Sequence, residues 1–231
     1  MPRLPELIVA LDVQTRAEAE RLVRLLRPAV RFFKVGPVLF TACGPDAVRI
    51  VHDHGGQVFL DLKFFDIPRT VEEAVRQAAR LGVTMLTVHT LGGVEMMGRA
   101  VRAAHTSPSP PRLIGVTLPT HMEEAEMRAA GIEGRPHEAV VRLARLAHRA
   151  GLHGVVCAAP EVAAVKETCG PEFLTVVPGI RSQPVQDDDQ ARTGDPSSAA
   201  GAGADYLVLG RPVLQAQDPL GAVRGVLGAL R

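Results

Sequence analysis

Two lysines and two aspartates stand where short apolar strands are expected to end. Lys34 lies at the end of one apolar run, and Asp61, Lys63 and Asp66 follow another within the segment Asp61-Leu62-Lys63-Phe64-Phe65-Asp66. Charged groups at such positions are costly to bury unless they are paired or take part in chemistry. An acid beside an ammonium group can stabilise charge and move a proton. The arrangement therefore slightly favours a catalytic site over a structural ion-pair network.

The spacing of residues 58–63 is that of a strand. Apolar and polar side chains alternate there, which predicts that Asp61 and Lys63 face one side while Phe59 and its apolar neighbours pack elsewhere. The following segment, residues 67–71, begins a helix because a proline at its start is followed by apolar residues at helical spacing. Asp66 precedes this helix, so a simple capping role is an alternative to a role in chemistry.

Strand-like and helix-like patterns alternate along the whole chain. The predicted strands are Leu7–Val13, Phe32–Val35, Gln57–Lys63, Met85–His89, Leu113–Leu118, Gly154–Ala158, Leu174–Pro178 and Tyr206–Gly210. Amphipathic helices separate them, and the last helix is expected near residues 220–230. Eight such units predict an α/β protein with one (β/α)8 TIM barrel domain over residues 1–231, although the pattern alone leaves a doubly wound sheet open.

In a barrel of this kind the active site lies where the strands end. Polar residues gather at those positions in this sequence: Asp12, Lys34, Asp61, Lys63, His89, Thr117, Thr120, Arg181 and Arg211. This coincidence is the main internal indication that the protein is an enzyme. His89 is as compatible with a structural role as with a place in the site.

Two Gly–Arg segments indicate a phosphate site. Gly179-Ile180-Arg181 follows the seventh predicted strand and Gly210-Arg211 the eighth, and barrels often bind phosphate between the loops after these two strands. The polar segment 182–196 lies between them. We expect a mobile phosphate-closing loop at about residues 181–196, with a solvated flexible connection as the alternative.

Length, composition and charge limit the function classes. A chain of 231 residues with 46% hydrophobic residues can bury a full core, and 26 Lys and Arg residues nearly balance 25 Asp and Glu residues. A net charge of +1 creates no overall field that would attract nucleic acid or an anionic membrane, so we expect neither partner. Any binding of anions is therefore expected to be local.

Cysteine usage and the N-terminal segment indicate a cytoplasmic protein. Cys43, Cys157 and Cys169 form no CxxC pair, which favours a reducing compartment and buried thiols. No long apolar segment near the N-terminus suggests a signal peptide or membrane span. His52 and His54 have the spacing of a metal pair, but a position at a helix C-terminus is the preferred interpretation.

The segment 61–70 resembles the signature of the orotidine 5′-phosphate decarboxylase family. Further agreement spans the chain in order, at Ala10-Leu11-Asp12, Lys34-Val35-Gly36, Pro178-Gly179-Ile180-Arg181, Gln190 and Gly210-Arg211. Related magnesium-dependent phosphosugar decarboxylases and aldolases share the central motif. In that group the residue at the second-strand position, which is Lys34 in this chain, resembles a glutamate that helps to hold the magnesium ion. A lysine would repel the cation, so no metal site is expected.

The resemblance implies a reaction and an assembly. The family removes carbon dioxide from C6 of orotidine 5′-monophosphate to give uridine 5′-monophosphate, the last step of de novo pyrimidine nucleotide synthesis, without a cofactor. Lys63 would stabilise and then protonate C6, and Asp61 would disfavour the charged ground state. Lys34 and Asp66 would keep Lys63 protonated and oriented. Asp66 and Thr70 resemble residues that reach the neighbouring subunit's site, which implies a homodimer with shared active sites.

The same resemblance implies the substrate contacts. Asp12, Lys34 and Asp61 would contact the nucleotide, the first two through the ribose hydroxyls, and Thr120 would meet the pyrimidine edge. The phosphate would lie against Pro178, Arg181, Gly210 and Arg211, and Gln190 would bridge phosphate and base. Phe65, Arg69 and the Leu118-Pro119-Thr120-His121 segment depart from the common family pattern. The alternatives are a magnesium-dependent phosphosugar decarboxylase or aldolase and a noncatalytic barrel that binds a phosphate ligand.

Overall fold

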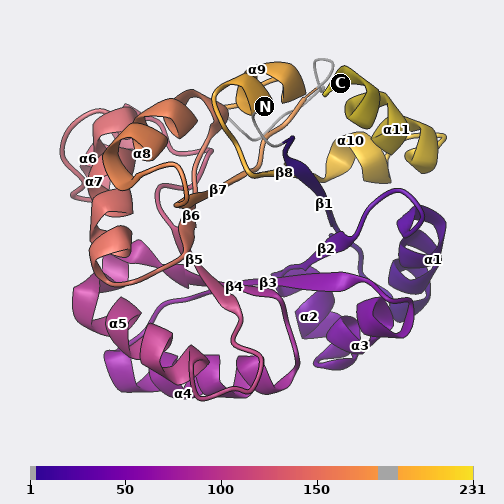
Figure 1. The fold of residues 1–231 in the computed structure, drawn as a ribbon, viewed down its shortest axis with the longest axis horizontal. Helices are drawn as coiled ribbons and strands as arrows, with labels where there is room; N and C mark the ends of the chain where they lie inside the picture. The colour runs from indigo at the N-terminus through magenta and orange to yellow at the C-terminus, as the bar shows by residue number, and fades with distance from the viewer. Residues whose placement is uncertain (1–3, 182–191, 231) are drawn as a thin grey trace.

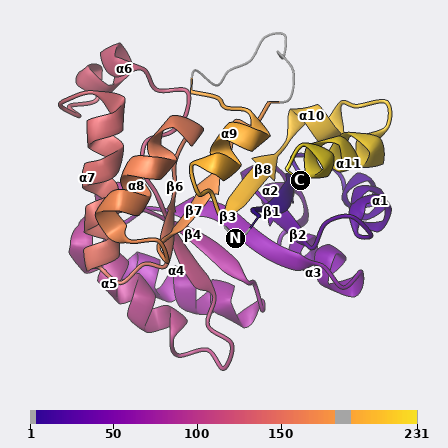
Figure 2. The same ribbon diagram turned by 45° about the horizontal axis from the view of Figure 1, so that its top comes forward.

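A computed structural model describes residues 4–181 and 192–230 (Figure 1). Within these residues, eight parallel strands pair in chain order from β1 to β8, and β8 pairs with β1 to close a barrel. Helices surround the barrel on the outside, as Figures 1 and 2 show. The predicted (β/α)8 fold is confirmed, and the doubly wound alternative is wrong because the pairing of β8 with β1 closes the sheet and leaves it no edge strand.

The strands begin and end close to the predicted positions. They are β1 (Glu6–Ala10), β2 (Phe32–Val35), β3 (Gln57–Phe64), β4 (Met85–His89), β5 (Arg112–Val116), β6 (Gly154–Val156), β7 (Leu174–Val177) and β8 (Tyr206–Leu209). β1, β5 and β6 end two or three residues earlier than predicted. The residues beyond these strand ends, among them Asp12 and Thr120, therefore belong to loops at the mouth of the barrel.

The helices follow the strands around the barrel. They are α1 (Arg16–Leu26), α2 (Pro37–Cys43), α3 (Asp46–Asp53), α4 (Pro68–Arg80), α5 (Gly93–Ala104), α6 (Glu124–Ala129), α7 (Pro136–Arg149), α8 (Val162–Cys169), α9 (Pro196–Gly201), α10 (Arg211–Leu214) and α11 (Pro219–Ala229), with 3-10 turns η1 (Thr90–Gly92) and η2 (Ala159–Glu161). Local chemistry sets several starts: the Thr15 side chain caps α1 and the Asp218 side chain caps α11. Pro68 is the first residue of α4, as the sequence predicts.

Strand alternation divides the core into two parts. One set of strand residues packs inside the barrel, namely Ile8, Ala10, Phe32, Phe59, Met85, Ile114, Val176, Tyr206 and Val208. The intervening residues, such as Val9, Leu60 and Leu86, pack outward against the helices in the larger cluster. The interior set forms an apolar floor, with the Phe32 and Tyr206 rings edge-to-face at 5.4 Å. Polar groups farther along the same strands therefore stand on a packed, water-excluding base.

The segment 182–196 differs from the predicted loop at its C-terminal end. Pro196 is the first residue of α9, and the Asp195 side chain caps that helix by accepting a hydrogen bond of 2.9 Å from Ser198 N. Gly194 pairs with the strand-seven loop through Gly194 N to Gly179 O and Arg181 N to Gly194 O. Gly194 is thus anchored by backbone hydrogen bonds and Asp195 by its side chain. Residues 182–191 lie outside the described part of the chain.

The other sequence predictions have mixed outcomes. Cys157 and Cys169 are buried as expected, whereas Cys43 is only half-buried, and all three are free thiols. His54 lies at the C-terminal end of α3, where its ring contacts Ile50 O at 3.0 Å, in agreement with the helix-end interpretation. Of the helices in the described residues, none combines the length and the apolar character that crossing a membrane requires.

Candidate active site

A cavity of about 320 Å³ opens at the end of the barrel where the strands finish. Its polar or loop-derived lining comprises Asp12, Lys34, Asp61, Lys63, Pro119, Thr120, His121, Pro178, Gly179, Arg181, Gly210 and Arg211. Its apolar lining includes Ala10, Phe59, Val156, Val176 and Val208, all from inward-facing strand positions. Seven of the nine polar residues predicted to gather at the strand ends therefore line this cavity. The other two, His89 and Thr117, do not line it, and the buried Thr117 hydroxyl instead donates a hydrogen bond of 2.7 Å to Val156 O.

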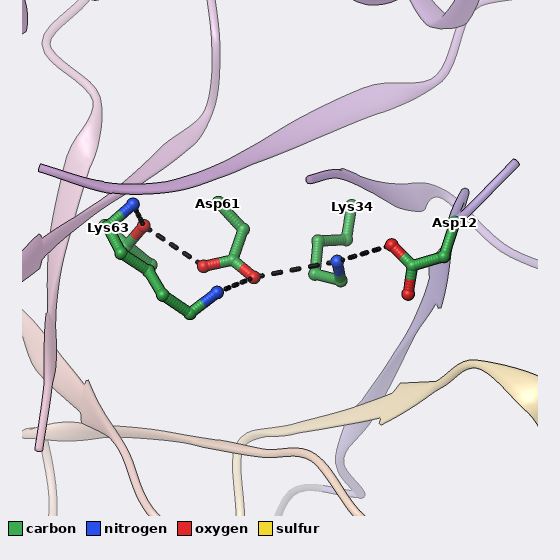
Figure 3. Close-up of polar contacts among 5 residues, drawn as sticks. Asp12, Lys34, Asp61 and Lys63 are labelled. Atoms are coloured by element: carbon green, nitrogen blue, oxygen red, sulfur yellow. Dashed lines mark hydrogen bonds and ion pairs between the residues drawn. The ribbon is translucent and has the colours of Figure 1, made fainter. Parts of the chain in front are cut away.

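Four charged side chains form a continuous row across one side of this cavity (Figure 3). Asp12 Oδ1 lies 3.0 Å from Lys34 Nζ, which in turn lies 3.6 Å from Asp61 Oδ2. Lys63 Nζ lies 2.8 Å from the same Asp61 oxygen. Negative and positive groups thus alternate from the loop after β1 to β3, and one carboxylate oxygen receives both ammonium groups.

The strands set the depth of these groups. Lys34 and Asp61 belong to β2 and β3, and their side chains are only 12% and 10% exposed. Lys63 and Asp12 stand nearer the opening, with side chains 45% and 46% exposed. Asp61 therefore lies under the two groups that a ligand would meet first.

One orientation expected from the sequence is wrong. The sequence placed Phe59 on the opposite side of the strand from Asp61, but both side chains line the same cavity. Residues two apart on a strand face the same side, so Phe59 extends the apolar floor directly beneath Asp61.

Burial and charge act in opposite directions on Asp61. Burial by itself raises the pKa of this carboxyl, but the ammonium groups of Lys34 and Lys63, with hydrogen bonds from Lys63 and Thr87, lower it more. The pKa of Asp61 is consequently below its usual value. The site therefore holds an ionised carboxylate at neutral pH in a place where water is largely excluded.

Lys63 has an unusual backbone. Its φ is 51°, the one positive value among the described non-glycine residues. Such a conformation costs a residue with a Cβ about 1–2 kcal/mol. The pairing of β3 with β4 is also irregular here, since Leu60 pairs with Leu86 and Phe64 with Val88. Four residue steps on β3 match two on β4, which is a bulge that redirects Lys63 toward Asp61.

The candidate phosphate end of the cavity is formed by two loops. Pro178, Gly179 and Arg181 follow β7, and Gly210 and Arg211 follow β8. Gly179 has a φ of 73°, which a glycine adopts without strain and which turns the chain so that Arg181 follows the cavity rim. The sequence thus predicted correctly that both Gly–Arg segments meet in one place. Gln190 lies outside the described residues.

Arg192 was missed by sequence reasoning, because it lies within the segment expected to be a loop. Its side chain forms an ion pair with buried Glu161 and donates hydrogen bonds to Leu118 O and Pro119 O at 3.0 and 2.9 Å. Its backbone N donates to Thr120 O at 3.1 Å. These contacts fix the loop after β5, which carries Thr120 and His121 on the cavity wall.

Asp66 and Thr70 do not join the charged row of their own chain. Both are exposed, and neither lines the cavity. The sequence also allowed a helix-capping role for Asp66, but the N-cap residue of α4 is Ile67. Among the described residues, the Asp66 carboxylate accepts one hydrogen bond, from Ile67 N at 2.6 Å.

His89 has a local structural role. Its Nδ1 accepts a hydrogen bond from Leu91 N at the start of η1, and its ring lies 5.3 Å from that of Phe65. Burial, followed by the nearby charge of Lys63, lowers the pKa of His89. His89 does not line the cavity. Among the described residues, no group of three or more His, Cys, Asp or Glu side chains could hold a metal ion.

Comparison with known proteins gives consistent results. The model of the Orotidine 5'-phosphate decarboxylase / HUMPS family matches residues 5–226. The chain is 48% identical over 227 residues to the orotidine 5'-phosphate decarboxylase of Syntrophotalea carbinolica, covering 96% of this chain and 93% of that protein. It is 49% identical over 220 residues to that of Pelobacter propionicus, covering 94% and 92%. The crystal structure of the Lactobacillus acidophilus enzyme of this name superposes with a TM-score of 0.86 at 33% identity, covering 99% and 100%.

Proposed function

The chain belongs to the Orotidine 5'-phosphate decarboxylase / HUMPS family and decarboxylates orotidine 5′-monophosphate, and we propose that the row from Asp12 to Lys63 performs this reaction. The enzyme is a carboxy-lyase that forms uridine 5′-monophosphate and carbon dioxide in the last step of de novo pyrimidine nucleotide synthesis. The observation that carries the residue assignment is the placement of Lys63 Nζ beside an ionised, buried Asp61 in the strand-end cavity.

The chemistry requires a proton donor and a charge-stabilising group at one carbon. When the bond from C6 to the carboxylate breaks, its electron pair stays on C6 and carbon dioxide leaves. The Lys63 ammonium stabilises that charge and then gives its proton to C6, and the resulting amine regains a proton from solvent. No electron acceptor is needed, because the electron pair left on C6 forms the new C6–H bond and the reaction is redox-neutral.

Asp61 and Lys34 prepare this step electrostatically. The substrate carboxylate approaches the ionised Asp61, which raises the free energy of the charged ground state more than that of a transition state whose charge has moved to C6. The Lys34 ammonium group favours the ionised form of Asp61, and Asp61 in turn forms an ion pair with Lys63. Two ammonium groups flanking one carboxylate also disfavour a divalent cation at this position, so we propose a metal-free reaction without a cofactor.

The remaining cavity residues bind the rest of the nucleotide. Asp12 and Lys34 hold the ribose hydroxyls, and Thr120 meets the pyrimidine edge. Pro178, Arg181, Gly210 and Arg211 receive the phosphate at the other end of the cavity, where arginine can bind it with two parallel hydrogen bonds. The proposal also includes Gln190, which would bridge the phosphate and the base. It further includes a closing movement of residues 181–196 over the bound phosphate.

We further propose a cytoplasmic homodimer in which Asp66 and Thr70 enter the partner's site. Phe65 and Ile67 are 59% and 68% exposed, and Leu91 and Val94 are 45% and 39% exposed. We call these four residues the β3–β4 apolar patch, because they follow two neighbouring strands. Exposed apolar groups on both sides of Asp66 in the sequence, and after the neighbouring strand β4, support an interface with a second copy of the chain.

The decisive experiment follows the ultraviolet absorbance of orotidine 5′-monophosphate with purified protein and a chelator. The wild type should remove the orotate chromophore, and Lys63→Ala should lower kcat by at least about a thousandfold because the proton donor is gone. Lys166→Ala is a matched control, since Lys166 pairs with Asp205 at 2.7 Å outside the cavity and should retain near wild-type turnover. Retained activity in Lys63→Ala would refute the assignment, and dependence on added magnesium would favour the phosphosugar alternative.

A further inference from the structure

A buried hydroxyl group joins the two residues at the centre of the charged row. Thr87 lies on β4 and is fully buried. Its Oγ1 lies 2.8 Å from the backbone N of Lys63 and 3.1 Å from Asp61 Oδ1. Thr87 itself does not line the cavity. One side chain that cannot touch a ligand is therefore bonded to both groups that the reaction needs.

The direction of both hydrogen bonds follows from the partners. A backbone N–H can only donate, so the Thr87 oxygen accepts from Lys63. An ionised carboxylate can only accept, so the Thr87 hydroxyl donates to Asp61. The hydroxyl therefore uses its donor and one acceptor position at once. A change in the position of one partner alters the geometry available to the other.

The bulge in β3 explains why this hydroxyl is needed. Because four residue steps on β3 face two on β4, the N–H of Lys63 has no regular ladder partner there, and Thr87 supplies it. The left-handed conformation of Lys63 is unfavourable for a residue with a side chain and persists only where surrounding contacts enforce it. The bond to Thr87 is such a contact, applied at the backbone of the proposed proton donor.

We propose that Thr87 is a positioning residue for the decarboxylation, which holds Lys63 in its left-handed conformation and orients the Asp61 carboxylate through one hydroxyl group. The inference rests on the proposed function, because it presumes that Lys63 and Asp61 act on the substrate. Its effect is on the geometry and charge of those two groups. It therefore acts on the chemical step and leaves the contacts to the phosphate and ribose in place.

The test compares Thr87→Val, which keeps the shape and removes the hydroxyl, with Thr87→Ser, which keeps the hydroxyl. Thr87→Val should lower kcat by about 10- to 100-fold with a much smaller change in KM, because displacement of a reacting group by about an ångström costs about that much. Thr87→Ser should recover most of kcat. The hydrogen bond from Thr87 helps to lower the pKa of Asp61, so the acid limb of the kcat profile should move to higher pH in Thr87→Val.

The chain contains a matched control for loss of a buried hydroxyl. Thr175 is also fully buried on a strand, and its Oγ1 donates to a carboxylate, that of Asp205, at 3.1 Å, away from the cavity. Thr175→Val should leave kcat and its pH profile unchanged. A Thr87→Val enzyme with wild-type kcat, or a Thr87→Ser enzyme as slow as Thr87→Val, would overturn the proposal. So would a Thr175→Val enzyme that is equally impaired.

Two further measurements keep the outcomes separate. Binding of uridine 5′-monophosphate by each variant reports whether the cavity is folded. If Thr87→Val fails to bind it, Thr87→Ser and Thr87→Cys replace that variant as a graded pair. Thr87→Cys should then have the lower kcat, because a thiol is a weaker hydrogen-bond donor than a hydroxyl. Equal kcat in that pair would reject the proposal. Wild-type protein without turnover would instead reject the proposed function itself, before any variant is compared.

Discussion

Asp61 occupies the most constrained position among the individual residues of the site. Its Oδ2 receives two ammonium groups, at 2.8 and 3.6 Å, and its Oδ1 receives the Thr87 hydroxyl at 3.1 Å. A carboxylate saturated in this way resists protonation even though it is buried. It can therefore repel the carboxylate of a substrate without itself being neutralised, which is what ground-state destabilisation requires of it.

The same contacts predict how stability depends on pH. Because the pKa of Asp61 is lowered in the folded state, its ionised form stabilises the fold above the ordinary pKa of an aspartate, and this contribution is lost as the pH falls through the lowered value. Asp61→Asn should reduce the free energy of unfolding by about 2 kcal/mol at neutral pH, since it removes charge-assisted hydrogen bonds. Thermal unfolding of the wild type and of Asp61→Asn, measured from pH 7 to pH 3, should show that the difference in their free energies of unfolding becomes smaller as the pH falls. A difference that stays constant would contradict this account.

Among the structural elements, the loop after β5 depends on a residue distant in sequence. Arg192 precedes α9, yet it bonds the carbonyl groups of Leu118 and Pro119 and pairs with Glu161 in η2. Burial raises the pKa of Glu161, while Arg192 opposes that effect. A buried ion pair of this kind contributes through specificity of placement, because it orders three loops around one guanidinium group.

Removing the charge of Glu161 should therefore disturb both stability and binding. Glu161→Gln keeps the size of the side chain but leaves Arg192 buried without its counter-charge, which should cost about 3 kcal/mol of unfolding free energy. Since the loop that carries Thr120 would lose its anchor, KM for the nucleotide should rise. Denaturant unfolding and steady-state kinetics check both effects. Glu138→Gln removes an exposed pair with Arg135 on α7 and should change neither; an equal effect of both substitutions would contradict the anchoring role.

The elements also show what the sequence can and cannot predict. All eight strands were predictable because period-two patterns and turn residues are local signals, and the meeting of Lys34, Asp61, Arg181 and Arg211 followed from the barrel geometry. The bulge at Lys63 was not predictable, since it depends on the pairing of β3 with β4. Thr87 could have been noticed as a polar residue at an inward position of an apolar strand. Arg192 gave no such signal, because its partners lie more than thirty residues away.

At the scale of the whole molecule, one end of the barrel combines two surfaces. The cavity and the β3–β4 apolar patch lie on adjacent loops, and Asp66 stands between Phe65 and Ile67 within the patch. α4 and α5, which begin in these loops, pack side by side (Figure 1). An interface built on this patch would place Asp66 and Thr70 of one subunit near the partner's site. Catalysis would then depend on assembly, even though each barrel contains its own Lys63.

Mixing two inactive variants tests this dependence. Suppose Lys63→Ala and Asp66→Ala proteins are each inactive and are allowed to exchange subunits. If Asp66 acts in the partner's site, a mixed dimer has one doubly altered site and one intact site, so an equal mixture should recover about a quarter of wild-type activity through its mixed dimers. Mixing Lys63→Ala with Lys34→Ala is the control. Both lysines act within one barrel, so every site keeps a lesion and no activity should return. Turnover of orotidine 5′-monophosphate after mixing provides the readout, with light scattering to establish the mass of the assembly. If the Asp66→Ala mixture stays as inactive as the control, Asp66 serves its own subunit and the shared-site proposal is wrong.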